Sequence, residues 1–323
     1  MKKVLILMLA VLLISSSVVF AAGSSEQEDD VFKVAYIARA QGDSFASWLA
    51  NSIQQEMDKY PDMEVDIMDG QASDEKVNSF IENSITNQYD LIILQPNNGE
   101  AQTPYVLQVV AAGIPIILTN PRIPDLMGTT YSVDADPYEQ GAVNARYAVD
   151  LVPQNAKVVV LNGPAGNMHS TARELAWDKE FFAKRPDVTI VGEQIAHWNK
   201  DEAMSFMEDW VQANDKIDAV ISMNDNMAAG ALEVVKDNPK YDDLLVFGVD
   251  GTAEAALLIE EGRLTSTSFQ NAYELAIKNA KLAHDILTGE VTDLVDTDID
   301  CPLITKENVE LLMDAHRATG AIQ

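Results

Sequence analysis

The sequence has little cysteine and little positive charge. Cys301 is the one cysteine among 323 residues, so an internal disulfide and a zinc site of paired cysteines are both excluded. Lys and Arg number 22 against 51 Asp and Glu, which gives a formal net charge of −29. A surface this acidic repels phosphates, so we expect neither a nucleic-acid partner nor a basic membrane-binding patch.

Signals of enzyme chemistry are also scarce. The four histidines, His169, His197, His284 and His316, are scattered and show no metal-ligand spacing. No P-loop and no G-x-S-x-G nucleophile turn occurs, and the loop at residues 162–167 is interpreted as a strand-to-helix turn rather than a phosphate cradle. We therefore expect a protein that is not an enzyme and that uses no cofactor and no metal.

The first 22 residues are typical of a secretory signal peptide. A basic start (MKK) precedes Val4–Ile14, an apolar run of 11 residues that is short for a membrane span. Small residues at Ala21 and Ala22 predict cleavage there, with an uncleaved anchor as the alternative. Residues 23–31 form an acidic leader, and loss of the two lysines takes the formal charge from −29 to −31. We expect an exported, periplasmic protein, with no cysteine near the junction to carry a lipid.

Short apolar runs then alternate with amphipathic segments. This rhythm predicts parallel sheets covered by helices on both faces. It pauses over Asn120–Asp136, which suggests two doubly wound α/β lobes that meet near Asp134. Strands are expected at Phe32–Ala38, Glu64–Met68, Leu91–Leu94, Ile114–Thr119, Lys157–Leu161, Val188–Glu193, Ala219–Ser222, Leu244–Val249 and Leu264–Ser268. Helices are expected at Phe45–Tyr60, Asp74–Asn87, Pro104–Ala112, Glu139–Leu151, Thr171–Ala183, Asp201–Ala213, Met227–Lys236, Thr252–Glu261 and Ala272–Leu287.

The residues that follow the strands favour a hydroxyl-rich ligand, because ligands of open parallel sheets bind beyond the carboxyl ends of the strands. A sugar hydroxyl both donates and accepts hydrogen bonds, and its ring has apolar faces that pack on aromatic rings. The matching polar side chains are Arg173, Asn224, Asp250 and Gln270, and the matching aromatic ones are Phe45 and Trp198.

Each of these side chains also has an ordinary structural interpretation. Arg173 could lie on the surface beside Glu174, and Asp250 could cap the helix that follows it. Trp198 could belong to the core. Their joint occurrence at strand ends favours the binding site.

Several segments, taken in order, resemble the type I periplasmic binding proteins of the ribose- and galactose-binding group, the solute receptors of ABC importers. The resemblance covers nearly the whole chain after the signal peptide. Its segments are VAYI at 34–37, AGIPI at 112–116, DPYEQG at 136–141, LNGPAG at 161–166, TARE at 171–174, MNDNMAAGAL at 223–232, FGVDGT at 247–252 and PLITKENV at 302–309.

The resemblance implies roles for individual residues. Phe45 matches a stacking aromatic and Asp43 the polar residue two before it, while Trp198 matches the aromatic of the second lobe. The ligand-binding arginine and the three residues that bind hydroxyls are matched by Arg173, Asn224, Asp250 and Gln270.

The chain also departs from the ribose pattern at some of these positions. Asn120-Pro121-Arg122 stands where ribose receptors have Asp-Arg. Arg39 replaces a small hydroxyl residue and Ala46 a second aromatic. We keep Arg39 and Asn120 as candidate ligand-binding residues, and Arg39 could instead pair with Asp43.

The family fold implies a hinge that the chain crosses three times, near Asp134, Gln270 and Ile299. Residues 32–134 and 271–298 would form lobe 1, and residues 135–270 and 299–323 would form lobe 2. The implied function is capture of a monosaccharide or polyol between the lobes and its delivery, by a monomer, to an ABC permease.

Three alternatives stay open at this point. The protein could be a sensory receptor that docks to a chemoreceptor or a histidine kinase. It could bind a sugar acid, although the acidic surface favours a neutral ligand. An exported sugar enzyme is the third alternative, against which the missing acid/base pair counts.

Overall fold

The computed structural model describes residues 31–322. The predicted signal peptide, its cleavage point and nearly all of the acidic leader lie outside the described residues. In the described part, none of the helices is both long and apolar enough to cross a bilayer.

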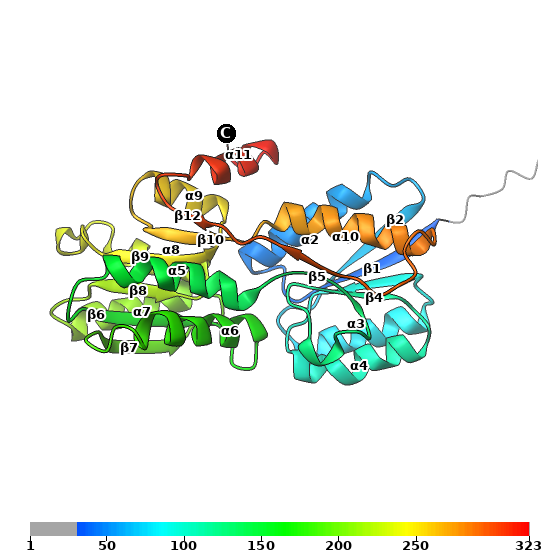
Figure 1. Ribbon diagram of the computed structural model, residues 1–323, viewed down its shortest axis with the longest axis horizontal. Coiled ribbons are helices and arrows are strands. Elements are labelled where there is room, and N and C mark those ends of the chain that lie inside the picture. The colour runs from blue at the N-terminus through cyan, green and yellow to red at the C-terminus, as the bar shows by residue number, and fades with distance from the viewer. Residues whose placement is uncertain (1–30, 323) are drawn as a thin grey trace, which may run out of the picture. The chain divides into compact units, whose positions relative to one another are not determined.

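Two six-stranded sheets form the framework (Figure 1). The first has the order β11-β5-β4-β3-β1-β2 and the second the order β12-β10-β9-β8-β6-β7. All neighbouring strands are parallel except β10 and β12. We call the unit built on the first sheet lobe 1 and the unit built on the second lobe 2. The predicted fold class, two doubly wound α/β lobes joined by three crossings, is confirmed.

The strands of lobe 1 are β1 (Phe32–Ala38), β2 (Met63–Asp69), β3 (Leu91–Leu94), β4 (Ile116–Thr119), β5 (Tyr131–Ala135) and β11 (Asp296–Ile299). Its helices are α2 (Ser44–Met57), α3 (Asp74–Thr86), α4 (Gly99–Ala111) and α10 (Ala272–Leu287), with a 3₁₀ turn, η1 (Pro124–Leu126). Figure 1 shows α2 and α10 on one face of this sheet and α3 and α4 on the other.

The strands of lobe 2 are β6 (Lys157–Asn162), β7 (Thr189–Ile195), β8 (Ala219–Ser222), β9 (Leu245–Asp250), β10 (Ser266–Phe269) and β12 (Leu303–Ile304). Its helices are α5 (Pro137–Leu151), α6 (Met168–Trp177), α7 (Lys200–Ala213), α8 (Asp225–Val235), α9 (Ala253–Glu260) and α11 (Glu310–Ala318). A π-helical turn, η2 (Asp178–Phe182), extends α6, and η3 (Pro239–Tyr241) is a 3₁₀ turn. The exact residues at which one lobe ends and the other begins stay a prediction.

Hydrophobic run length and polar caps account for most of these elements. The run LIIL of β3 is fully buried, as expected for the middle of a parallel sheet whose two faces are both covered. Polar residues at the strand-to-helix turns start the helices, because their side chains accept hydrogen bonds from the first turn. Asp43, Asn98, Asn167 and Asn224 cap α2, α4, α6 and α8 in this way.

The sequence interpretation was wrong about α4. A helix over Pro104–Ala112 was expected. The helix instead begins at Gly99, where the side chain of Asn98 accepts hydrogen bonds from the N–H groups of Glu100 and Ala101. Pro104 therefore lies inside the helix.

Strand β5 was also missed, in the stretch where the rhythm of the sequence pauses. It is completely buried and pairs with β4 and β11, although it contains Ser132 and Asp134. Burial raises the pKa of Asp134 to about 7, while backbone N–H donors and the Arg122 guanidinium favour its charged form. Strands β11 and β12 were not predicted as elements either.

Candidate functional site

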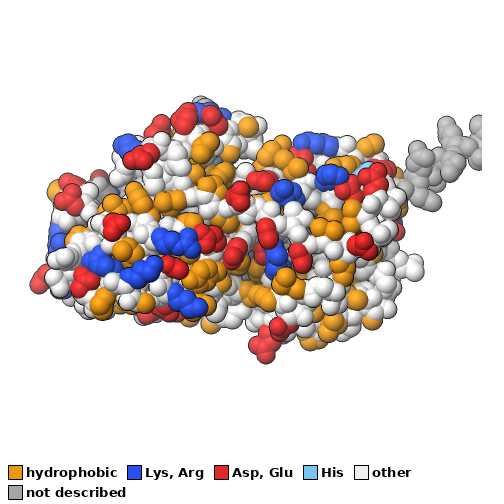
Figure 2. All heavy atoms as spheres, in the orientation of Figure 1, with side chains coloured by type: hydrophobic (Ala, Val, Ile, Leu, Met, Phe, Trp, Pro, Cys, Tyr) orange, Lys and Arg blue, Asp and Glu red, His pale blue; other side chains and the backbone are white. Residues whose placement is uncertain are grey.

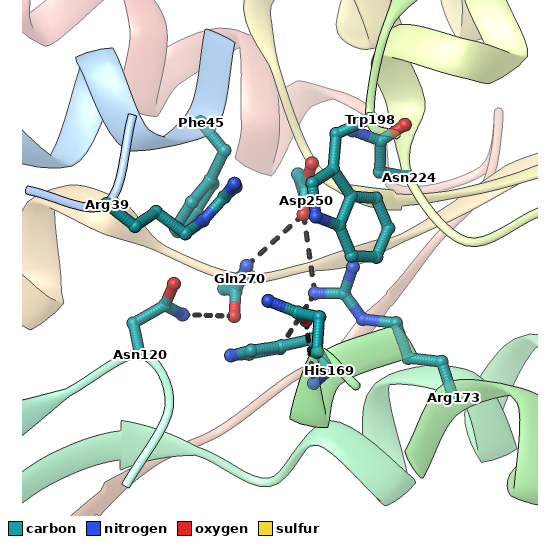
Figure 3. Close-up of a pocket in the computed structure, with 10 residues that line it drawn as sticks. Arg39, Phe45, Asn120, His169, Arg173, Trp198, Asn224, Asp250 and Gln270 are labelled. Carbon is teal, nitrogen blue, oxygen red and sulfur yellow. Dashed lines mark hydrogen bonds and ion pairs between the residues drawn. The ribbon is translucent and has the colours of Figure 1, made fainter. Parts of the chain in front are cut away.

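A small cavity lies where the carboxyl ends of strands from both lobes meet (Figure 3). Its empty space, counting the part that is open to solvent, amounts to about 250 Å³. Its lining mixes amides, guanidinium groups, one carboxylate, one imidazole and two aromatic rings. The lining residues are Arg39, Phe45, Asn120, Asn167, His169, Arg173, Trp198, Asn224, Asp250 and Gln270.

Arg173 is the most firmly held polar side chain of the cavity. It is 3% exposed and its guanidinium donates to Gln140 Oε1 from both Nε (2.8 Å) and Nη2 (2.6 Å), and to the Met223 carbonyl from Nη1 (2.6 Å). Nη2 also lies 3.1 Å from His169 Nδ1 and 3.5 Å from Asp250 Oδ1. These contacts fix the orientation of the guanidinium before any ligand arrives.

Asp250 is the carboxylate of the cavity and ends strand β9. Burial raises its pKa well above the ordinary range, and the neighbouring Arg173 guanidinium acts in the opposite direction. Its backbone has a φ of 122°, and the lining residues Asn120 (44°) and Trp198 (61°) also have positive φ. Such backbone strain in non-glycine residues is characteristic of functional sites.

A chain of amides connects the two lobes across the cavity. Asn120 Nδ2 donates to Gln270 Oε1 at 2.5 Å, and Gln270 Nε2 donates to Asp250 Oδ1 at 3.2 Å. Gln270 Oε1 also accepts from Gln140 Nε2 at 2.7 Å. Gln270 directly follows β10 and precedes α10, so the connection is made where the chain crosses between the lobes.

The two aromatic rings come from different lobes. Phe45 lies in the first turn of α2 and Trp198 lies after β7; they are 2% and 5% exposed. The Arg39 and Arg173 guanidinium carbons lie 5.9 Å and 5.5 Å from the centre of the Trp198 ring, within the distance at which cations are attracted to a ring face.

Gly163 makes room for the Trp198 ring. A β-carbon at position 163 would lie 2.2 Å from ring atoms of Trp198. The close approach of the loop after β6 therefore requires glycine, which gives one glycine of the LNGPAG segment a direct structural reason.

Every predicted site residue except Asp43 lines this cavity. Asp43 instead caps α2 by accepting from the Ala46 N–H at 2.8 Å, and its other oxygen lies 3.0 Å from Arg39 Nη2 without hydrogen-bond geometry. Asp43 faces a larger, adjoining hollow that shares Arg39 and Trp198 with the inner cavity. The pairing of Arg39 with Asp43, which was one of two alternatives for Arg39, is thus observed.

The structural alternatives for single residues can now be compared with their surroundings. The surface interpretation of Arg173 is wrong, because the side chain is buried against Gln140 and Met223. The capping interpretation of Asp250 is wrong as well, because Thr252 caps α9. Trp198 both packs in the core of lobe 2 and lines the cavity.

Two lining residues were not predicted, namely Asn167 and His169. Both follow β6 at the start of α6, and Asn167 Nδ2 donates to the Asn97 carbonyl of lobe 1 at 3.1 Å. The position of this loop after a strand was the available signal.

Within residues 31–322 no three or more His, Cys, Asp or Glu side chains are grouped as metal ligands would be.

One face of the molecule carries mixed charge. Figure 2 shows Asp and Glu side chains spread over the visible face, with Lys and Arg among them. The negative charge of the chain is therefore not gathered into one patch on this face.

Comparison with known proteins gives a consistent result. A family model described as a periplasmic binding protein domain matches residues 34–290. The chain is 28% identical over 239 residues to a xylitol-binding protein of Mycolicibacterium smegmatis, covering 73% of this chain and 67% of that protein. It is 29% identical over 228 residues to a ribose import binding protein of Bacillus subtilis, covering 71% of this chain and 73% of that one.

A solved structure is similar as well. An ABC transporter solute binding protein from Bacillus halodurans with bound myo-inositol superposes with a TM-score of 0.82 at 28% identity, covering 89% of this chain and 99% of that chain.

Proposed function

This chain belongs to the periplasmic binding protein family, and from that premise we propose that it captures a neutral monosaccharide or polyol between its two lobes and presents it to the permease of an ABC importer. The ligand leaves chemically unchanged, so the protein acts as a receptor and not as an enzyme. We place the protein in the periplasm as a monomer, after removal of residues 1–22. The relatives named for xylitol and ribose and the neighbour with bound myo-inositol support this class of ligand.

The observation that carries the proposal is the composition of the cavity. Side chains from both lobes meet at the carboxyl ends of parallel strands, the place where this kind of sheet binds ligands. Amides and a carboxylate accept from sugar hydroxyls, guanidinium groups and amides donate to them, and Phe45 and Trp198 offer rings for the C–H faces of a sugar.

The charges at the site favour a neutral ligand over a sugar acid. Arg173 lies beside Asp250, and Arg39 lies beside Asp43, so the two guanidinium groups are each matched by a carboxyl group. An added carboxylate would have to compete with these partners in a buried site. We therefore assign the neutral compound as the ligand.

Closure of the hinge supplies the mechanism. The ligand contacts both lobes only when they are closed, so binding shifts the population toward the closed form. Closing removes water, after which a ligand that lacks one hydroxyl leaves a buried protein group without a partner. The permease then distinguishes the closed shape from the open one.

A thermal melting screen tests this proposal. Purified protein is heated with myo-inositol, xylitol, D-ribose, D-allose and the acids D-gluconate and D-galacturonate. At 100 times Kd a ligand adds about 2.7 kcal/mol of stability, so the melting temperature should rise by roughly 5 °C or more with a neutral compound.

The screen can also contradict the proposal. A shift with the acids alone would replace the neutral ligand by an anionic one, and mass spectrometry showing conversion of a bound sugar would indicate an enzyme. Loss of uptake of the ligand, in a strain from which this protein has been deleted, tests delivery to a permease.

A further inference from the structure

Two ring nitrogens of residues that line the cavity have no hydrogen-bond partner within residues 31–322. His169 Nε2 and Trp198 Nε1 are both buried, since the side chains are 6% and 5% exposed, and both residues line the cavity. A buried polar group without a partner costs free energy, so each of them calls for a partner supplied by a ligand. Which partner depends on whether the group donates or accepts.

The tautomer of His169 follows from the amide of Gln140. Gln140 Nε2 donates to the Ala135 carbonyl at 3.1 Å and to Gln270 Oε1 at 2.7 Å. This fixes the amide orientation, so Gln140 Oε1 faces Arg173 and accepts two hydrogen bonds from its guanidinium. Both acceptor positions of that oxygen are then occupied.

Arg173 next determines which ring nitrogen of His169 carries the proton. A guanidinium can only donate, and Nη2 lies 3.1 Å from His169 Nδ1. Nδ1 therefore holds the lone pair and accepts, although it also lies 3.2 Å from the already occupied Gln140 Oε1. The proton of the neutral ring is on Nε2, the nitrogen that has no protein partner.

The ring is also held neutral. Burial lowers the pKa of His169 well below its ordinary value, and the charges of Arg173 and Arg39 act in the same direction. His169 Nε2 is thus an N–H donor with no acceptor capacity, and the indole N–H of Trp198 has the same limitation.

We propose that His169 and Trp198 form a donor-only wall that sets ligand specificity, so that the bound sugar or polyol must direct acceptor oxygens toward them. A hydroxyl, ether or carbonyl oxygen satisfies this wall, whereas an ammonium group at the same position faces only donors and is rejected. This inference rests on the proposed function and specifies which ligand atoms the site selects.

The first test needs no ligand. In ¹⁵N-labelled protein near neutral pH, the NMR chemical shifts of the His169 ring should show a protonated Nε2 and an unprotonated Nδ1. The opposite tautomer, or a doubly protonated ring, would overturn the inference, because Nε2 would then be an acceptor or the ring would be charged.

The second test measures affinity for the best-bound of myo-inositol, xylitol, D-ribose and D-allose. His169→Leu removes the donor and should weaken binding by roughly 10- to 100-fold, the effect of leaving one buried hydrogen bond unmade. His169→Gln places an amide N–H near the former Nε2 and should recover most of that loss. Trp198→Phe keeps a ring and removes only the N–H, and it should weaken binding by roughly 10-fold.

Matched controls separate binding from folding. His284→Gln alters a histidine that lies beside Asp62 and Tyr60, away from the cavity, and should leave affinity unchanged. Each variant is also melted without ligand. Wild-type affinity in a folded His169→Leu variant would overturn the inference and leave the proposed function intact. A wild-type protein that binds none of the four compounds would overturn the proposed function and this inference with it.

Discussion

The two arginines of the cavity, one from each lobe, differ in how firmly they are held. In lobe 2, the Arg173 guanidinium donates to Gln140 and to the Met223 carbonyl and contacts His169 and Asp250. In lobe 1, Arg39 lies beside Asp43 and over the Trp198 ring of the opposite lobe. The contribution of lobe 2 to the lining is also larger, with Asn167, His169, Arg173, Trp198, Asn224 and Asp250 against Arg39, Phe45 and Asn120.

This difference indicates that the two lobes have different roles in binding. A polar wall that is already oriented does not lose side-chain freedom when the ligand binds, so it can discriminate between ligands at little entropic cost. Lobe 2 therefore carries most of the discrimination. Lobe 1 contributes a flat ring and an amide that complete the site when the lobes close.

The largest contrast is expected between the two arginines. Arg173→Met removes a buried guanidinium that lines the cavity; a hydrogen bond from a charged donor is worth up to about 3 kcal/mol, so Kd should rise by up to roughly 100-fold. Arg39→Met removes an ion pair at the edge of the cavity and should raise Kd by roughly 10-fold. Isothermal titration calorimetry with the best-bound neutral compound measures both, and equal losses would contradict the different roles of the two lobes.

Substitution of the lobe 2 ring, Trp198, should also raise Kd more than substitution of the lobe 1 ring, Phe45. Trp198→Ala removes a ring, its N–H and its contacts with two guanidinium groups, whereas Phe45→Ala removes a ring alone. We expect Kd to rise by roughly 100-fold for Trp198→Ala and roughly 10-fold for Phe45→Ala. A larger effect at Phe45 would transfer the dominant role to lobe 1. Melting of each variant without ligand shows whether packing has changed.

Gly163→Ala tests the position of Trp198 without altering that residue. The new methyl group would meet the indole ring at 2.2 Å, so the ring must shift, and we expect Kd to rise by roughly 10-fold. Gly42→Ala is the matched control, because nothing lies within 4 Å of its added carbon. Equal affinities of the two variants would show that the exact position of the indole is unimportant.

A separate expected effect concerns the pH dependence of stability. The native His169 ring resists protonation because of burial and the charges of Arg173 and Arg39, whereas in the unfolded chain it titrates near pH 6.5. Below that pH the unfolded state takes up the proton first, so the stability that His169 provides above pH 6.5 is lost as the pH falls.

Urea unfolding of the wild type and of His169→Gln at pH 8, 6.5 and 5 measures this effect. The free energy of unfolding of the wild type, relative to that of His169→Gln, should decrease by about 1.4 kcal/mol for each pH unit below 6.5. Asp134, whose pKa burial raises to about 7, acts in the opposite direction but equally in both proteins. A difference that does not change with pH would contradict a native ring that stays neutral.

Much of the fold could be predicted from the sequence because its signals are local. The buried runs of β3 and β8 and the amphipathic pattern of α10 gave correct boundaries, since run length and period depend only on neighbouring residues. Strand β5 was missed because Ser132 and Asp134 lie in it, and only the tertiary partners of these side chains make their burial tolerable.

The residues of the candidate site also include some that could be predicted from the sequence and some that could not. Residues directly after strands, such as Asn224 and Gln270, were found from position alone. His169 also follows a strand, but the loop before it was interpreted as a plain strand-to-helix turn, and the contacts of His169 with Gln140 of α5 and Arg173 of α6 are visible only in the structure. Asp43 was placed in the site, and the cap that it provides for α2 places it beside the cavity instead.

A crystal structure of the protein grown with the best-bound of myo-inositol, xylitol, D-ribose and D-allose tests the central claim most directly. We expect density for one molecule between Phe45 and Trp198, with its hydroxyl groups bonded to Arg173 and Asp250 and acceptor oxygens directed at His169 Nε2. Density for that molecule bound to one lobe alone, with the lining residues unaltered, would contradict a receptor that closes around its ligand.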